Sequence, residues 1–315
     1  MMRLNRRGKH PAIMQVPPQP IGRRSASAER MVPNQGQDRG RAGLFSQRNN
    51  RNMVQAAGTT LTLIYHQTVY NLRTEHRNAI VGLLMTIAQT SVMMMAFMGL
   101  YLIMGVRSSP IRADFILFLM SGIMLFLTHI QTVGAVSGSH NLGGLTRHQP
   151  LNAAIMIAAA SLAVLYRQTI TIMTLLGVYH LLFNPLRLED PLGCVVMFLL
   201  SWFSGCCVGL IFLGLRPWFP KGSKLMTTMY QRINMIASGK MFVANILPNI
   251  MLPFFSWNPL FHVIDQTRGF AFINYTPQKT DPYYALWFSL VALMIGLLIN
   301  FTTRKYESIS WGATS

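Results

Sequence analysis

The 315-residue chain has few charged residues, and acidic residues are the scarcest of them. Charged side chains make up 11% of the sequence, with 9 Asp and Glu against 27 Lys and Arg. A soluble globular protein usually has about 25% charged residues, because charge helps to cover its surface. Apolar residues reach 51% and gather in long runs without charge. This composition excludes an ordinary soluble protein and indicates an integral membrane protein.

Patterns that carry enzymatic or metal chemistry are missing as well. The phosphate-binding loop G-x-x-x-x-G-K-[ST] does not occur, no long apolar run contains an Asp or Glu, and no hydrolase-type arrangement of Ser, His and Asp is present. Cys194, Cys206 and Cys207 form no CxxC pair, and the histidines lack metal-ligand spacing. No nucleic-acid recognition motif accompanies the net charge of +18. We therefore expect no catalytic residue, no metal, no cofactor and no nucleic-acid partner.

Six segments are long enough to cross a bilayer, which takes about 20 residues of mostly apolar sequence. Two of them carry embedded cations: 161–183 contains Arg167, and 225–247 contains Arg232 and Lys240. The other four are free of acidic and basic residues: 80–104, 115–136, 192–215 and 284–302. The predicted fold class is an all-α integral membrane protein with six transmembrane helices.

The charges between these segments predict the topology. On one side of the membrane the connections carry Lys and Arg with almost no acid, and on the other side basic and acidic residues balance. The positive-inside rule then places both termini in the cytoplasm. Residues 1–57, rich in Arg, Pro, Gly and polar residues, are interpreted as a disordered basic cytoplasmic tail that contacts anionic membrane lipids. Residues 58–310 are expected to form the transmembrane domain.

Two segments outside the long apolar runs have patterns of their own. Apolar residues recur every three to four positions from Leu61 to Leu72. This predicts an amphipathic helix over 61–77, which either lies along the inner membrane surface or packs on a neighbouring helix. Between 248 and 281, prolines divide the sequence into apolar pieces too short to span. We expect re-entrant helices there, at the outer face.

Four side chains are candidates for lining a transport path: Lys240, Arg232, Trp257 and Tyr284. Cations within the membrane are costly and often mark a route for substrates. Lys240 in a water-filled path would attract an anionic cargo, although either cation could instead snorkel to the membrane surface or form a dimer contact. The two aromatic residues belong to a cluster that is either an interfacial belt or a stacking platform for sugar rings.

Several short motifs together resemble a known family. They are, in chain order, Arg77 with Gly82-Leu83-Leu84, Phe118-Leu119-Met120-Ser121-Gly122, Ser238-Gly239, Leu247-Pro248, the run Asn258 to Arg268, and Leu293 with Gly296-Leu297-Leu298 before Arg304-Lys305. The run N-P-L-F-H-V-I-D-Q-T-R is the most specific of them. The chain resembles the membrane subunit of type-2 ABC exporters, in the branch that exports capsular and related cell-surface polysaccharides. The resemblance covers roughly residues 60–305.

The resemblance implies an assembly in a bacterial cytoplasmic membrane. Two copies of the chain would form a homodimer whose interface is the conduit, and a separate ABC ATPase subunit would hydrolyse ATP. In that family the loop after the second span docks into the ATPase, which corresponds here to Asn141, Leu142, Arg147 and His148. The resemblance also assigns five motif residues to the outer re-entrant region: Asn258, Pro259, His262, Asp265 and Arg268.

The predicted function is that of a permease subunit, not an enzyme, which moves a lipid-linked capsular or other cell-surface polysaccharide outward. The same fold could export another cargo, such as a teichoic-acid-like polymer, another glycan or a drug. A membrane-embedded glycan polymerase or acyltransferase is a different alternative, but it would need acid, base or nucleophile groups at the membrane face. A structural scaffold would leave the embedded cations without a role.

Overall fold

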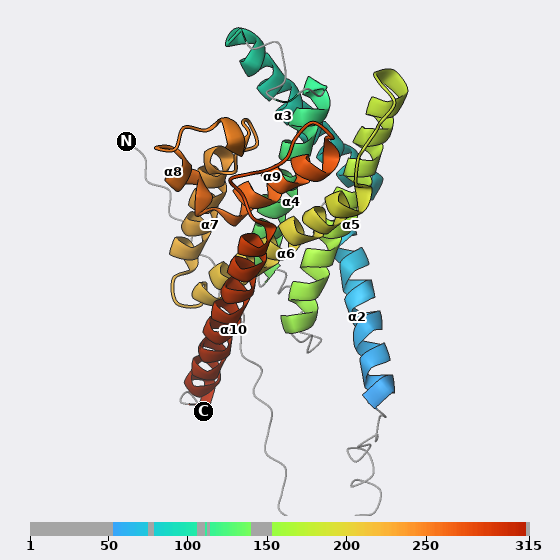
Figure 1. Cartoon of the computed structure of the whole chain (residues 1–315). Coiled ribbons are helices and arrows are strands. Elements are labelled where there is room, and N and C mark those ends of the chain that lie inside the picture. The colour runs from blue at the N-terminus through green and yellow to red at the C-terminus, as the bar shows by residue number, and fades with distance from the viewer. Residues whose placement is uncertain (1–52, 75–78, 106–110, 112–113, 140–152, 313–315) are drawn as a thin grey trace, which may run out of the picture. The chain divides into compact units, whose positions relative to one another are not determined.

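The computed structural model describes residues 53–74, 79–105, 111, 114–139 and 153–312. Within these ranges the chain is helical and contains no strand, which confirms the prediction of an all-α fold. In chain order the helices are α2 (Met53–Thr74), α3 (Ala79–Ile103), α4 (Phe115–Gly138), α5 (Ala153–Leu182), α6 (Pro191–Leu215), α7 (Pro220–Ala237), the short 3-10 helix η2 (Ala244–Ile246), α8 (Leu252–Ser256), α9 (Pro259–Ala271) and α10 (Pro282–Gly312) (Figure 1). Residues 1–52 of the predicted tail lie outside the described ranges.

Five helices of the described residues are long and apolar enough to cross a membrane. They are Ile80–Ile103, Phe115–Gly138, Ala153–Leu182, Pro191–Leu215 and Pro282–Thr303. Each matches one of the predicted spans, with α5 beginning earlier than the predicted 161. Their number and length agree with a multi-pass membrane protein.

The sixth predicted span, 225–247, is not one continuous helix, so this prediction was wrong in its boundaries. The helix of this region, α7, ends at Ala237, and the chain turns at Gly239, where φ is 69°. Residues other than glycine rarely adopt this left-handed conformation, which commonly ends a helix. A side chain at Gly239 would also collide with the ring of Phe261. Lys240 therefore lies in a turn and not inside a span.

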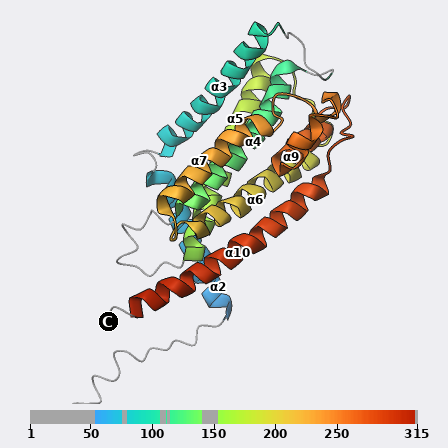
Figure 2. The ribbon, with the colours of Figure 1, turned by 90° about the vertical axis from the view of Figure 1, so that its left-hand side faces the viewer.

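The central helix of the described residues is α4. It contacts α3, α5, α6, α7 and α9, and Figure 2 shows it among α5, α6 and α7. Its side chains are buried on all sides, as for Phe118, Ile123 and Phe126, because it is apolar around its whole circumference. At its start, Asp114 accepts hydrogen bonds from Tyr179 and from Asn184. These bonds hold the pKa of the Asp114 carboxyl below its ordinary value.

The close packing of α6 against α4 depends on two glycines. A Cβ at Gly205 would lie 2.7 Å from the backbone oxygen of His129, and one at Gly209 would lie 2.8 Å from Cβ of Val136. Glycine lets the two backbones approach at these points. On its other side α6 packs along α10, where Asn300 donates to the carbonyl of Leu210 at 2.9 Å.

The polarity of α7 is the reverse of that in a soluble amphipathic helix. Its polar side faces the protein: Ser223 donates to the carbonyl of Phe212 at 2.6 Å, and Gln231 donates to that of Ile130 at 3.0 Å. The opposite side is exposed and mostly apolar, and its apolar residues are Leu225, Met226, Met229, Ile233, Met235 and Ile236. Because of its polar side, the mean hydropathy of α7 is too low for it to be one of the five apolar helices.

The amphipathic helix predicted over 61–77 corresponds to α2, which begins earlier, at Met53, and is described as far as Thr74. It packs against α5 and α3. Its half-buried side includes Ile64, Gln67 and Asn71, so the face toward the protein is mixed in polarity, while Leu61 is exposed.

Candidate functional site

The most specific sequence motif lies on α9, and it holds together residues 238–281, here called the cap region. Asn258 is the N-cap of α9 and accepts a hydrogen bond from the backbone N–H of Leu260 at 3.1 Å. Its amide donates to the side chain of Asn234 at 2.9 Å and to the carbonyl of Ala237 at 3.0 Å. Pro259 occupies the first turn, where its missing N–H costs no hydrogen bond. Asn258 therefore links the start of α9 to the end of α7.

Arg268 is fully buried and binds the turn that follows α7. Its guanidinium donates to the carbonyls of Gly239 at 3.1 Å, Lys240 at 2.6 Å and Phe242 at 2.6 Å. It also lies 4.1 Å from the centre of the Phe118 ring of α4. Burial lowers the pKa of Arg268 to about 10, so the side chain stays charged at neutral pH.

Gly122 of α4 makes room for this arrangement. A Cβ at that position would lie 2.8 Å from both the Nη2 atom of Arg268 and the carbonyl oxygen of Lys240. The motif fragment Ser121-Gly122 is thus explained by a close approach between α4 and the cap region.

Asp265 and His262 complete the cap region. The carboxylate of Asp265 accepts from the backbone N–H of Ala244 at 3.1 Å, from Tyr275 at 2.7 Å and from Thr280 at 2.8 Å. Nδ1 of His262 accepts from the N–H of Asp281 at 3.0 Å, so its Nε2 must donate to the carbonyl of Ser256 at 2.8 Å.

That pattern of bonds requires a neutral imidazole at His262. Burial lowers the pKa of His262, in agreement with the neutral form. The motif residues are therefore engaged in hydrogen bonds that define the shape of the cap region, and none of them is arranged as an acid, base or nucleophile for catalysis.

Lys240, predicted as a conduit candidate, has an exposed fraction of only 1%. Its ammonium donates to the carbonyl of Met235 and lies 3.8 Å from the centre of the Phe126 ring and 5.0 Å from that of Phe97. The carbonyl belongs to the last turn of α7, where a cation is favourable. Aromatic faces also attract a cation. Within the single chain, Lys240 thus binds α7 to α3 and α4.

The other three conduit candidates lie on the surface of the single chain. Arg232 is exposed in the middle of the apolar side of α7. Trp257 and Tyr284 are exposed and adjacent, since the Tyr284 hydroxyl donates to the carbonyl of Trp257 at 2.8 Å. The ring of Tyr284 also packs on that of His262, with centroids 4.5 Å apart. The structure thus brings together the two aromatic candidates and places Arg232 on a different helix.

The predicted ATPase-docking residues Asn141, Leu142, Arg147 and His148 lie outside the described residues. The helix that leads into them is fixed at its end, because Arg216 after α6 donates to the carbonyl of Ser137 at 3.2 Å. The ends of α4 and α6 therefore lie close together at this side of the protein.

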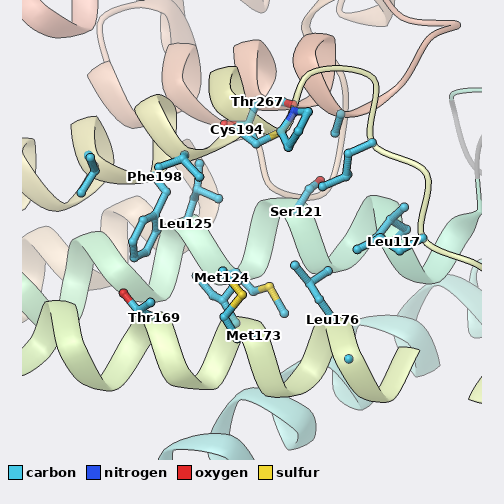
Figure 3. A pocket seen from close by; sticks show the side chains of 18 of the residues that line it. Leu117, Ser121, Met124, Leu125, Thr169, Met173, Leu176, Cys194, Phe198 and Thr267 are labelled. Atoms are coloured by element: carbon cyan, nitrogen blue, oxygen red, sulfur yellow. Dashed lines mark hydrogen bonds between the residues drawn. The ribbon is translucent and has the colours of Figure 1, made fainter. Parts of the chain in front are cut away.

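A recess of about 640 Å³ lies between α4, α5, α6 and α9 (Figure 3). Its walls are almost wholly apolar: Leu117 and Met124 come from α4, Met173 and Leu176 from α5, and Phe198 from α6. A sugar polymer would need many hydrogen-bonding groups along its path, because its hydroxyls lose their bonds to water. This recess is suited to hydrocarbon instead.

A second cavity, of about 590 Å³, lies between α2, α3, α4 and α5 and has more polar groups in its walls than the recess. Its lining includes Asn71, Gln89, Gln131 and Arg167. Arg167 is one of the embedded cations of the sequence, but it was not predicted as a site residue. The sequence features that could have pointed to this cavity are Arg167 inside an otherwise apolar segment and the glutamines Gln89 and Gln131 in two other spans. Which of these residues meet could not be deduced from their spacing.

Comparison with known proteins gives one kind of relative. No family model matches the chain. Two proteins from Escherichia coli, each named polysialic acid transport protein KpsM, are each 26% identical to it over 238 residues, which cover 74% of this chain and 90% of the relative. This similarity to polysialic acid transport proteins, over most of both chains, confirms the resemblance drawn from the motifs at the level of a distant similarity.

Proposed function

We propose that the chain is the permease subunit of an ATP-driven exporter that moves a lipid-linked capsular or other cell-surface polysaccharide across the bacterial cytoplasmic membrane. The observation that carries this proposal is the similarity to polysialic acid transport proteins over 90% of their length. Five helices of the described residues that are long and apolar enough to cross a membrane support it.

In this proposal α7 is the sixth crossing, despite its low average hydropathy. It has 18 residues, or about 27 Å of helix, close to the roughly 30 Å of hydrocarbon in a bilayer. It begins where Ser223 binds the carbonyl of Phe212 on α6, and it ends where the turn at Lys240 packs on Gly122 of α4. Its polar groups are bonded to the protein and its apolar side is left for lipid or protein. Six crossings would return the chain to its starting side and put both termini in the cytoplasm.

The same helix supports the proposed homodimer. Arg232 lies among Met229, Ile233 and Ile236 on the exposed side of α7, where contact with lipid would be costly for a charge. In a water-filled conduit between two copies, the Arg232 side chain would contact water instead of lipid. Trp257 and Tyr284 would offer aromatic faces near its outer end. Lys240 would enter this path only if Phe97 and Phe126 moved away from its ammonium.

We expect the ATPase subunit to dock on the loop 141–150. Arg147→Glu should then reduce the amount of ATPase that co-purifies with the permease by roughly tenfold, because reversal of a charge in an interface repels the partner's complementary charge. The measurement is the ratio of the two subunits after affinity purification from membranes. Arg187→Glu, on the α5–α6 connection, is the matched control and should leave the ratio unchanged. If the unmodified permease, Arg147→Glu and Arg187→Glu all retained the same amount of ATPase, this docking site would be excluded.

Deletion of the gene, followed by sugar analysis of separated surface and intracellular fractions, tests the function itself. An exporter predicts that polymer disappears from the surface and accumulates inside the cell. Absence of polymer from both fractions would favour a glycan polymerase, an acyltransferase or a synthesis scaffold. Unchanged polymer in both would reject polysaccharide as the cargo, and export of a teichoic-acid-like polymer, another glycan or a drug would be measured next.

A further inference from the structure

We propose that the cavity between α2, α3, α4 and α5 binds the phosphate headgroup of an anionic lipid, and that Arg167 is the residue that attracts it. The inference rests on the proposed function only for orientation: with cytoplasmic termini, the cavity lies in the cytoplasmic half of the membrane. It identifies a lipid site distinct from the conduit between two copies.

The cavity is lined by hydrogen-bonding groups from four helices. Asn71 comes from α2, Gln89 from α3, Gln131 from α4 and Arg167 from α5. Arg167 is the charged member among the described lining residues. The Gln168 amide donates to the oxygen of Gln131 at 2.7 Å, which fixes the orientation of Gln131 beside the cavity. The remaining walls are largely apolar, for example at Ala163 and Val164, so the cavity offers polar groups beside apolar ones, in contrast to the recess of Figure 3.

The position of Arg167 along α5 argues against simple snorkelling. It stands near the middle of Ala153–Leu182, about 20 Å from either end of the helix at 1.5 Å per residue. An Arg side chain cannot bridge that distance to the membrane surface. Ionisable residues at such depth face the protein interior or a water-filled cavity and commonly mark a binding site.

A phosphate group matches the chemistry of this lining. The guanidinium has a planar set of N–H donors that bind phosphate oxygens in pairs, and amide side chains add further donors. The volume of about 590 Å³ greatly exceeds the roughly 30 Å³ that one water molecule occupies, so the cavity has room for a headgroup.

The residues at the rim of the cavity favour a lipid over a free anion as the ligand. Met85 of α3 lines the cavity, and its exposed fraction is 57%. Since α3 is an apolar span, Met85 faces hydrocarbon in a bilayer. A headgroup that enters beside Met85 can leave its acyl chains in the membrane. The lipid phosphate could belong to bulk phospholipid or to the lipid anchor of the cargo.

Native mass spectrometry of the purified full-length chain tests the site. The detergent-solubilised protein is incubated with phosphatidylglycerol, with diacylglycerol, which lacks the phosphate, or with glycerol phosphate, which lacks the acyl chains. We expect retention of phosphatidylglycerol alone, and a loss of roughly tenfold in Arg167→Gln, because a hydrogen bond to a charged group is lost. Arg187→Gln removes an equal charge from an exposed connection and should retain the lipid as the unmodified chain does.

A second variant separates binding from folding. Gly138 lines the cavity, and a Cβ there would meet no atom within 4 Å. Gly138→Leu therefore fills the cavity while leaving Arg167 in place, and it should also lose retention without a lower thermal midpoint. Retention of phosphatidylglycerol by both Arg167→Gln and Gly138→Leu at the unmodified level, or equal retention of diacylglycerol, would overturn the proposal.

The source of the lipid is read from molecules that co-purify from cells. A sugar-bearing lipid lost in Arg167→Gln identifies the cargo anchor, whereas phospholipid without sugar identifies a structural membrane lipid. Either result supports a phosphate site, and neither depends on export. The deletion experiment can therefore reject the proposed function while the lipid site stands, or the reverse.

Discussion

Replacing Arg268 with Met should lower the thermal midpoint of the purified protein by roughly 10 °C, the largest effect expected for a single side chain outside the spans. The guanidinium donates to three backbone carbonyls, at Gly239, Lys240 and Phe242. Met fills much of the space but leaves the carbonyls of Lys240 and Phe242 without this donor, whereas the carbonyl of Gly239 keeps the backbone N–H of Phe242. Leaving a buried acceptor without its donor costs about 1–3 kcal/mol, so the loss at two carbonyls is large. The midpoint is measured by loss of the monodisperse protein after heating in detergent.

Two further variants make this prediction specific. Arg268→Lys keeps the positive charge but loses the planar set of guanidinium N–H donors. Its thermal midpoint should therefore fall between those of the unmodified chain and Arg268→Met. Arg187→Met removes an exposed arginine and should change the midpoint by no more than about 2 °C. If Arg268→Met were as stable as Arg187→Met, the cap region would not depend on the buried guanidinium.

The second large effect is expected at Gly205, where α6 meets α4. Its Cβ would lie 2.7 Å from the backbone oxygen of His129 and 3.0 Å from Cβ of Thr132. Neither atom can move without a shift of α4, so Gly205→Leu must separate the two helices. Overpacking of this kind costs about 1–3 kcal/mol, and we expect the upper end because the contact is with backbone.

Gly177→Leu is the matched control for Gly205→Leu. It makes the same substitution in a helix, but a Cβ at Gly177 meets no atom within 4 Å. It should be neutral or stabilising by up to about 1 kcal/mol, because Leu favours a helix more than Gly does. The measurement is the amount of folded protein recovered from membranes, with the thermal midpoint of each variant. Equal losses in the two variants would show that helix propensity or insertion matters here, and not the α4–α6 distance.

Both predictions bear on transport, because the cap region and the α4–α6 contact position the exposed side of α7. Asn258 joins α9 to Ala237, and Arg268 joins it to the turn at Gly239. Lys240 adds the contact with Phe97 of α3 and Phe126 of α4. In the proposed dimer these bonds would determine where Arg232 lies relative to the conduit.

The sequence identified the motif on α9 but not the contacts that its residues make. Asn258, Pro259, His262, Asp265 and Arg268 were identified by resemblance as one outer region, and the structure does bring them together. Their partners include backbone groups, such as the carbonyl of Ser256 for His262. Backbone groups carry no sequence signature, so no spacing could have identified these bonds.

Apolar runs by themselves determined which helices are long and apolar enough to cross a membrane, because the cost of placing a residue in hydrocarbon depends mainly on that residue and its immediate neighbours. The five apolar helices follow from this property. Only the tertiary structure decided where α7 ends and which way its polar side faces, since Gln231 and Asn234 are tolerated through bonds to α4 and α9. It also decided that Arg167 shares a cavity with Asn71 and Gln131. Contacts between residues distant in the chain depend on how helices pack, and the local sequence does not record that packing.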